Sequence, residues 1–260
     1  MFNIFSIINM ISYKYIFSLS TIPSRINYIE STIKSLLEQT LKPEKIILNI
    51  PKKYNLRFKS SIQKIHIEKV LNKYLHKIII NYIDSDYGPG TKLMGLIKSK
   101  LIKMDIEDTY IVLVDDDHIY KPQMLEYFDN YNKKIYDNKL KVASYYCYNL
   151  NKITIGQGAD GFFIKLNLLF DFEVYYDIIK KNDLILYHDD YYISYYFHLK
   201  QIPINHIKST IDNLIYVKEK SWNIDSLVSI KNEYNRSNLC KKIKKILSNL
   251  KNEGKFDNII

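Results

Sequence analysis

Residues 111–117 read Ile-Val-Leu-Val-Asp-Asp-Asp, a run of four apolar β-formers that continues directly into three acids. The apolar run predicts a buried strand, so the three carboxylates lie together where that strand ends. Carboxylates this close repel one another unless a cation lies among them. Because hard oxygen ligands suit Mg²⁺ or Mn²⁺, a divalent metal site is one interpretation of this stretch. A solvated turn after the strand is the other.

Predicted strands and helices alternate through the first half of the chain. Strands are expected at residues 15–20, 44–50, 77–83 and 111–114, and helices at 26–37, 62–75 and 91–101. This alternation predicts an α/β fold with a largely parallel central sheet and helical crossovers. The Ile-rich third strand is expected to be buried on both faces. Ser24 and Thr91 are the expected N-caps of the first and third helices.

The second half of the chain has a different pattern. Strands are expected at residues 141–148 and 162–165, joined by a connection that contains Gly156, Gly158 and Gly161. A helix is expected after Asp190. Residues 239–250 predict an amphipathic helix whose polar face is rich in lysine.

Polar segments follow three of the predicted strands, at residues 21–25, 84–90 and 115–117. In largely parallel sheets, ligands bind beyond the carboxyl ends of the strands. The three segments should therefore converge on one crevice. This convergence favours a functional site at residues 115–117 over a solvated turn.

The length of 260 residues suits one large α/β domain with an appendage, and we expect a domain over residues 1–220 and a Lys-rich helical extension over 221–260. The net charge of +10 would attract phosphates, nucleotides and anionic membranes. The abundance of Lys, Asn, Ile and Tyr is also typical of AT-rich coding. The lysine-rich extension could dock on a membrane, on a partner or on its own domain.

Localisation is predicted from the cysteines and the N-terminal stretch. Cys147 and Cys240 form no metal-ligand pattern and no disulfide framework, which suits a reducing, cytoplasmic compartment. Residues 1–11 are apolar but too short to span a bilayer, and they lack the features of a signal peptide. An added strand or a short surface helix is expected there. Weak association with a membrane surface stays an alternative.

Four motifs occur in a fixed order, and the second contains the three acids at 115–117. They are Ser-Leu-Ser-Thr-Ile-Pro-Ser-Arg at 18–25, Val-Asp-Asp-Asp-His-Ile-Tyr-Lys-Pro at 114–122, Gly-Ala-Asp-Gly-Phe-Phe at 158–163 and His-Asp-Asp-Tyr-Tyr-Ile-Ser at 188–194. Over roughly residues 15–207, the chain resembles GT-A-fold nucleotide-sugar glycosyltransferases, closest to the inverting family 2 type. The resemblance implies a Rossmann-like nucleotide-binding half, an acceptor half, and transfer of a sugar from a nucleoside diphosphate, UDP above all, to a glycan, protein or lipid hydroxyl.

The resemblance also implies a metal site. Asp115 and Asp117 match the outer acids of the family's Asp-X-Asp motif, which holds Mn²⁺ or Mg²⁺ at the donor diphosphate, with Asp115 facing the ribose or the metal and Asp117 as the direct ligand. Asp116 lies within the donor-binding segment but points elsewhere if the backbone is extended, so a scaffolding role is expected for it. His206, past a late strand, matches a third metal ligand of some relatives. A structural histidine is the alternative there.

Asp189 and Asp190 match the family's acid pair at the start of a helix. By this resemblance Asp190 is the base that takes the proton of the acceptor hydroxyl. Capping of the helix by either acid is the alternative role. Trp222 could stack on a sugar, although core packing is expected for it.

Further residues match the family's donor-binding positions. The positions around the base and phosphates are Thr21, Pro23, Arg25 and Lys92. Asp84 or Asp86 matches a position at the nucleoside. The positions around the sugar and acceptor are Gly158, Asp160 and Gly161. Arg25 and Lys92 would pair with diphosphate oxygens. A solvated arginine and a surface lysine are the respective alternatives.

The chain departs from the family pattern at two places. Asn49-Ile50-Pro51 stands where the family has an acid that contacts the base, and Lys200-Gln201 replaces a glycine after the catalytic helix. Recognition of the base therefore stays open. Two other functions are also considered, a basic nucleic-acid-binding protein and a degenerate transferase that binds sugars without turnover.

Overall fold

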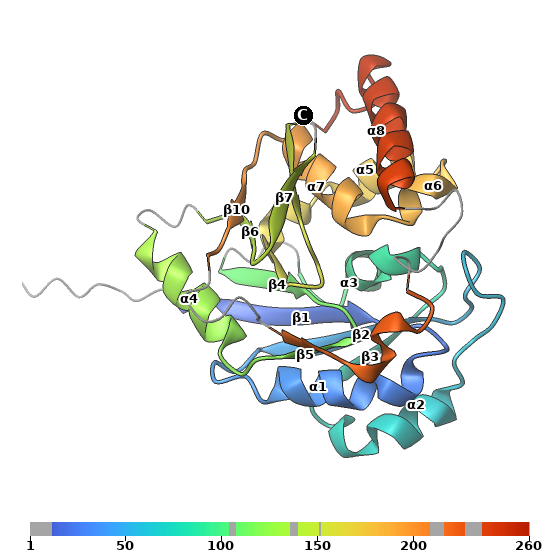
Figure 1. Cartoon of the computed structure of the whole chain (residues 1–260), viewed down its shortest axis with the longest axis vertical. Coiled ribbons are helices and arrows are strands. Elements are labelled where there is room, and N and C mark those ends of the chain that lie inside the picture. Colours follow the sequence, from blue (N-terminus) through green and yellow to red (C-terminus); the bar gives the residue numbers. More distant parts are fainter. Residues whose placement is uncertain are drawn as a thin grey trace, which may run out of the picture.

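A seven-stranded sheet runs through the molecule in the order β10-β6-β9-β4-β1-β2-β3 (Figure 1). The computed structural model describes residues 12–103, 108–135, 140–150, 152–208, 216–226 and 236–259. The strands are β1 (Lys14–Ser20), β2 (Lys45–Pro51), β3 (Ile79–Ile83), β4 (Thr109–Leu113), β6 (Val142–Ser144), β9 (Phe162–Lys165) and β10 (Ile204–His206). The expectation for residues 1–11 lies outside the described residues.

All neighbouring strands of this sheet are parallel except at β9, which is antiparallel to both β4 and β6. The predicted α/β fold with a mostly parallel sheet is therefore confirmed. The antiparallel strand divides the sheet into a parallel part, β4-β1-β2-β3, and a part that carries β6 and β10. Two small antiparallel pairs complete the strands, β5 (His118–Tyr120) with β11 (Tyr216–Lys218) and β7 (Cys147–Leu150) with β8 (Ile153–Gly156).

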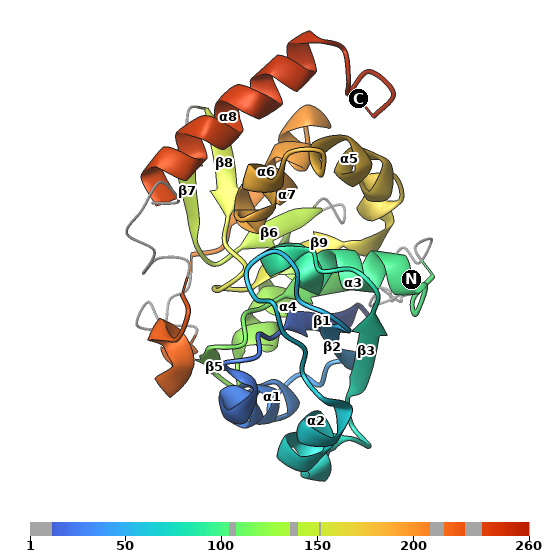
Figure 2. The ribbon, with the colours of Figure 1, turned by 90° about the vertical axis from the view of Figure 1, so that its right-hand side faces the viewer.

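Helices cover both faces of the sheet (Figures 1 and 2). One face packs against α1 (Ile29–Leu37), α2 (Lys64–Leu71) and α4 (Met124–Lys134). The other packs against α3 (Thr91–Ser99), α5 (Phe172–Ile179), α6 (Asp183–Leu186) and α7 (Asp189–Leu199), with α8 (Arg236–Asn252) outside these helices. Strand alternation explains the two cores: Ile16 and Phe17 of β1 are both buried, one in each apolar cluster. The two apolar faces of the sheet are thus both buried by helices.

Some local predictions were wrong. The stretch 141–148 is not one strand, because β6 ends at Ser144 and β7 belongs to a separate hairpin. The third strand, β3, is only partly buried since it lies at the edge of the sheet. Ser24 caps no helix: its hydroxyl is buried without a hydrogen-bond partner, and the chain enters α1 through a 3₁₀ turn, η1 (Ile26–Tyr28). Thr91 is the first residue of α3, and its hydroxyl accepts a hydrogen bond from the Tyr87 N–H.

The C-terminal helix α8 packs on its own domain. Its apolar residues Leu239, Ile243 and Leu247 are buried in the same cluster as α7, and the Tyr195 hydroxyl of α7 donates to the Leu247 carbonyl at 3.3 Å. Of the docking partners considered from the sequence, the structure therefore shows the chain's own domain. Among the described residues, no helix combines the length and apolar character that crossing a bilayer requires.

A buried polar network beneath α3 accounts for the departure at Asn49. The Asn49 amide donates to the Ser18 hydroxyl at 2.9 Å, and its carbonyl oxygen accepts from Asn81 at 2.7 Å. Gly95 of α3 lies directly above, where an added Cβ would come within 2.7 Å of the Asn49 oxygen. Asn49 thus joins β1, β2 and β3 below the helix, and it lies in the core rather than at a nucleotide base.

Candidate active site

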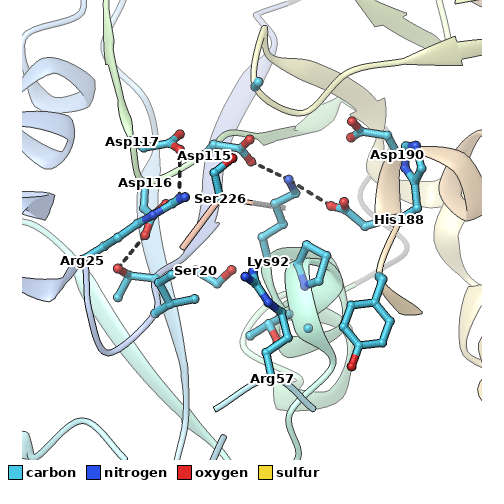
Figure 3. Close-up of a pocket in the computed structure, with 18 of the residues that line it drawn as sticks. Ser20, Arg25, Arg57, Lys92, Asp115, Asp116, Asp117, His188, Asp190 and Ser226 are labelled. Carbon is cyan, nitrogen blue, oxygen red and sulfur yellow. Dashed lines mark hydrogen bonds and ion pairs between the residues drawn. The ribbon is translucent and has the colours of Figure 1, made fainter. Parts of the chain in front are cut away.

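The polar segments that follow β1, β3 and β4 meet in one pocket, as the sequence predicts (Figure 3). The cavity has a volume of about 310 Å³, and ligand pockets of proteins typically hold roughly 300–1,000 Å³. It lies beyond the carboxyl ends of β1 and β4, against the start of α7. Six aspartates line it, namely Asp86, Asp115, Asp116, Asp117, Asp189 and Asp190.

The loop that follows β4, residues 115–118, is held in place from below. The Asp115 N–H donates to the Tyr120 hydroxyl at 2.9 Å, and that hydroxyl donates to the Ala159 carbonyl at 3.1 Å. The Thr32 hydroxyl of α1 donates to the Asp116 carbonyl at 2.9 Å. These bonds fix the backbone, so the positions of the carboxylates are set before any ligand binds.

Asp116 is bound by two side chains of the segment after β1. Its carboxylate accepts from the Thr21 hydroxyl at 2.7 Å and from Arg25 at 2.8 Å. Arg25 also lies 2.9 Å from Asp117. Thr21 and Arg25 therefore hold the acid loop. The expected pairing of Arg25 with a diphosphate would require its guanidinium to leave two nearly buried carboxylates.

Lys92 lies between the two acid groups of the pocket and is not the surface lysine considered as the alternative. Its side chain is 5% exposed, and its Nζ lies 2.6 Å from Asp115 and 2.9 Å from Asp189. Burial lowers the pKa of Lys92, but the charges of Asp115, Asp189 and Asp190 outweigh this effect and hold its pKa well above the usual value. The ammonium thus stays charged and links the end of β4 to the start of α7.

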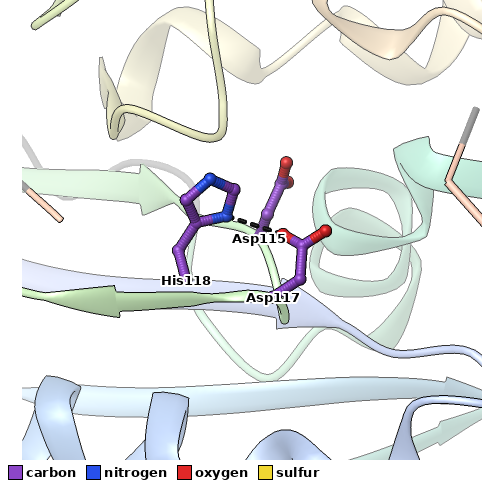
Figure 4. Close-up of side chains that lie close together, drawn as sticks. All are labelled: Asp115, Asp117 and His118. Atoms are coloured by element: carbon purple, nitrogen blue, oxygen red, sulfur yellow. Dashed lines mark ion pairs between the residues drawn. The ribbon is translucent and has the colours of Figure 1, made fainter. Parts of the chain in front are cut away.

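Asp115, Asp117 and His118 form a group that could hold a metal ion (Figure 4). One potential ligand atom from each lies within 4.8 Å of the others, and the His118 Nδ1 lies 2.6 Å from an Asp117 oxygen. Burial raises the pKa of Asp115, whereas Lys92 and His118 lower it more strongly, so the net shift is downward and the carboxylate is ionised. The donor set is therefore two carboxylates and one imidazole.

Asp190 is in a different electrostatic situation. It follows Asp189 in the first turn of α7, and its Oδ1 accepts from the Gly158 N–H at 2.9 Å. Burial and the charge of Asp189 raise the pKa of Asp190 to about 7, against the lowering effect of Lys92. A carboxylate that gains and loses a proton near neutral pH is suited to general base catalysis. The capping alternative receives no support, since no side chain caps α7.

Glycine at position 158 is required by the close packing above Lys92. An added Cβ would lie 2.6 Å from the Lys92 Nζ and 3.3 Å from an Asp190 oxygen. Gly161 has a φ of +85°, which favours glycine. Gly158, Asp160 and Gly161 do not line the cavity itself; from this connection, Gln157 and Ala159 do.

Other predicted residues have structural partners. The carboxylate of Asp86 accepts from the backbone N–H groups of Asn55, Leu56 and Gly88 at 2.8–2.9 Å, so it holds the wall of the pocket. Asp84 pairs with Lys52 at the surface. Pro23 does not line the cavity, and neither does His206, whose Nε2 lies 3.1 Å from the Tyr145 carbonyl. In the described chain, the carboxylate–imidazole group contains His118 and not His206.

His118 and Arg57 are among the pocket residues that the sequence analysis missed, and Trp222 was expected elsewhere. His118 directly follows the acids, and this adjacency is a signal that could have been used. Arg57 follows β2 in a segment without any motif. Trp222 was expected in the core but lines the pocket from the 3₁₀ turn η6 (Lys220–Asn223), where Lys218 lies 3.4 Å from its ring centroid.

Residues 216–226, which we call the C-terminal strap, carry Trp222 to the pocket. The strap begins as β11 beside β5, and its Glu219 N–H donates to the Asp117 carbonyl at 2.8 Å. Further along, the Ile224 carbonyl accepts from Arg25 at 2.8 Å and the Asp225 carbonyl from Arg57 at 2.7 Å. The strap is therefore attached to the acid loop and to both arginines.

No model of a known protein family matches the chain, and no curated protein matches it. Solved structures do. TarS 1-349 of S. aureus in complex with UDP is 14% identical over 75% of this chain and 58% of that chain, with a TM-score of 0.48. The apo-form glycosyltransferase GlyE of Streptococcus pneumoniae TIGR4 is 14% identical over 75% of this chain and 44% of that one, with a TM-score of 0.42.

A third similar structure, 4-diphosphocytidyl-2C-methyl-D-erythritol synthase, is 9% identical over 80% of this chain and 94% of that chain, with a TM-score of 0.47. The chain spans about half the length of the TarS structures, between 48% and 58%. Likenesses at these levels of identity do not extend to an activity. The chemistry of the pocket has to be argued from its own residues.

Proposed function

We propose that this chain is a metal-dependent glycosyltransferase that moves a sugar from a nucleoside diphosphate sugar to a hydroxyl acceptor. The observation that carries the proposal is that one pocket holds a group suited to a metal ion and, apart from it, a carboxylate at the start of α7 whose pKa is raised. Asp115 and Asp117, beside His118, are suited to a cation, whereas Asp190 has a pKa of about 7. Sugar transfer needs both, since the leaving diphosphate gains charge while the attacking hydroxyl loses a proton.

The residues present fit a divalent metal. Asp115, Asp117 and His118 bring two carboxylates and an imidazole within 4.8 Å of one another. Carboxylates suit Mg²⁺ and Mn²⁺, and the additional imidazole nitrogen favours Mn²⁺ of the two. Asp115, Asp117 and His118 would hold the ion. When bound, it offsets the negative charge that develops on the leaving diphosphate.

Asp190 would act on the acceptor. Its carboxylate takes the proton of the acceptor hydroxyl while the hydroxyl oxygen forms a bond to the anomeric carbon. The bond from that carbon to the diphosphate oxygen breaks, and its electron pair leaves with the diphosphate. Attack from the face opposite the diphosphate gives inversion, in keeping with the resemblance of residues 188–194 to inverting enzymes. Lys92, held between Asp115 and Asp189, would keep the two acid groups at a fixed separation.

Uridine diphosphate sugars are the first donors to test, because the four sequence motifs resemble enzymes that use them. The acceptor would be a hydroxyl of a glycan, a protein or a lipid. The cytoplasm is the proposed compartment.

The test is the release of nucleoside diphosphate from a panel of nucleotide sugars, with and without Mn²⁺. The proposal predicts release from at least one donor, its loss on chelation with EDTA, and its loss in Asp190→Asn. Donor binding in the presence of Mn²⁺ without release, with or without added acceptors, would instead indicate a degenerate transferase. The absence of both binding and release for every donor would contradict the proposal.

A further inference from the structure

The pocket has a second side, away from the acid loop and Asp190, on which Asp86 lines the cavity with its carboxylate bound to backbone N–H groups. It is formed by the segment after β2 and by residues near the start of α7, with Tyr54, Leu56, Arg57, Phe58 and Tyr187 in the lining. Arg57 reaches into the pocket on this side, away from Asp115 and Asp117 in the view of Figure 3. A cation therefore faces the cavity from the wall opposite the acid loop.

The pocket cations differ in how they are neutralised. Arg25 and Lys92 each lie within 3 Å of two aspartates. For Arg57, no carboxylate of the described residues lies within ion-pair distance; its Nη2 donates to the Asp225 carbonyl at 2.7 Å, and its guanidinium carbon lies 5.1 Å from the Phe58 ring centroid. A neutral carbonyl is a weaker partner for a guanidinium than a phosphate is.

The electrostatics of Arg57 agree with this geometry. Burial lowers the pKa of Arg57, the charge of Asp225 opposes this shift, and the charge of Arg25 adds to it. The guanidinium stays protonated, because arginine titrates far above neutral pH. Its positive charge is consequently offset less than that of Arg25, whose pKa is raised by Asp116 and Asp117 against the effect of burial.

We propose that Arg57 is the cation that binds the diphosphate of the donor, in place of the Asp225 carbonyl. The inference rests on the proposed function. Arg25 and Lys92 are poorly suited to this task, since leaving their partners would expose buried carboxylates to one another. Lys218, the other pocket cation, is exposed and lies on the Trp222 ring. A diphosphate held between the acid loop and Arg57 would have a metal group on one side and a guanidinium on the other.

The proposal also couples donor binding to the C-terminal strap. Arg25 and Arg57 hold the consecutive carbonyls of Ile224 and Asp225. Asp225 has a φ of +48°, a conformation that residues other than glycine seldom adopt. If Arg57 turns to a diphosphate, the strap loses one of these two bonds, and the surroundings of Trp222 change.

Trp222 is the only tryptophan of the chain, so its fluorescence reports on the pocket. The experiment titrates UDP, inorganic pyrophosphate and uridine into the full chain with Mn²⁺, and follows fluorescence and thermal stability. The variants are Arg57→Gln, whose amide can still donate to Asp225, and Arg57→Lys, which keeps the charge. Lys59→Gln is the matched control, because Lys59 is exposed in the same segment and does not line the pocket.

Arg57→Gln should weaken the binding of UDP and of pyrophosphate by roughly 10- to 100-fold, as expected for the loss of a charged hydrogen-bond partner. The affinity for uridine should be unchanged. Arg57→Lys should recover part of the lost affinity for UDP and pyrophosphate. Lys59→Gln should bind all three ligands like the unsubstituted chain. If UDP and pyrophosphate bind Arg57→Gln as well as they bind the unsubstituted chain, this inference is wrong while the proposed function stands. The inference would also be wrong if Arg57→Gln lost as much affinity for uridine as for UDP. It would be wrong as well if Arg57→Lys lost as much affinity for UDP as Arg57→Gln does.

If the unsubstituted chain binds neither UDP nor pyrophosphate in the presence of Mn²⁺, this inference is wrong. The release assay with the full donor panel then decides the proposed function separately, because it does not depend on Arg57.

Discussion

The acid loop at residues 115–118 and the start of α7 face the same pocket, yet their carboxylates have different partners. In the loop, Asp115 lies within ion-pair distance of Lys92, and Asp116 of Arg25. Asp117 lies within ion-pair distance of Arg25 and beside the His118 ring. At α7 the ion pair from Lys92 goes to Asp189, while Asp190 accepts a backbone N–H.

This difference separates two roles that aspartate can have. Lys92 and His118 hold the pKa of Asp115 below its usual range, so this carboxylate is a permanent anion. Burial and Asp189 raise the pKa of Asp190 to about 7, so it can exchange a proton at neutral pH. Carboxylates whose environments push their pKa values apart are typical of sites where one acid stays charged and another moves protons. The loop is thus suited to a cation and Asp190 to a base.

The largest effect is expected from Asp190→Asn. Removing a general base lowers turnover by about 10²–10⁴-fold, and the account predicts a fall of about 1,000-fold in sugar transfer. Asn can still accept the Gly158 N–H, so the fold and the binding of the donor should be retained. Asp84→Asn, at an exposed ion pair with Lys52, is the control and should turn over normally. Full turnover in Asp190→Asn would remove the distinction between the two acid groups.

Lys92→Met tests whether one lysine holds both groups. Removing one partner of a buried ion pair typically costs about 3–5 kcal/mol of stability, and Lys92 is the buried partner of both Asp115 and Asp189. Lys98→Met is the matched control on the same helix, because Lys98 pairs with Glu173 nearer the surface and should cost about 1 kcal/mol or less. Unfolding in urea measures both. Equal destabilisation by the two substitutions would contradict the bridging role of Lys92.

The pH dependence of turnover tests the raised pKa. Asp190 can accept a proton only when it is ionised, so turnover should fall as the pH drops below about 7. The expected limb approaches a tenfold fall per pH unit. Rates with saturating donor between pH 5 and pH 8.5 give the profile, with Mn²⁺ binding measured in parallel. A profile that stays flat down to pH 5 would mean that Asp190 titrates like an ordinary aspartate.

Much of the fold could be predicted from the sequence because its periodic patterns are local. The strands at 15–20 and 162–165 and the alternation with helices follow from runs of apolar residues, and the parallel order brings three strand ends to one pocket. The break between β6 and β7 could not be predicted, since residues 141–148 are suited to a strand throughout. Which strand lies at the edge of the sheet is also set by topology, so the partial burial of β3 has no local signal.

The sequence points to the acids of the candidate site but not to the contacts that surround them. Asp115, Asp117 and Asp190 belong to motifs, and the structure brings them to one pocket. The ion pairs of Arg25 and Lys92, and the position of Arg57, depend on contacts between segments far apart in the chain. Trp222 reaches the pocket only because the C-terminal strap returns to the acid loop. Sequence patterns indicate which residues carry charge, but the fold decides which charges neutralise one another.

The most direct test of the division between the two acid groups is a thermal-shift measurement with a nucleotide sugar, with and without Mn²⁺, on three proteins: the unsubstituted chain, Asp117→Asn and Asp190→Asn. The account predicts Mn²⁺-dependent stabilisation of the unsubstituted chain and of Asp190→Asn. For Asp117→Asn it predicts that the Mn²⁺-dependent affinity for the nucleotide sugar falls by about 10- to 100-fold, as expected when a metal site is disturbed. Stabilisation that survives in Asp117→Asn and disappears in Asp190→Asn would contradict it.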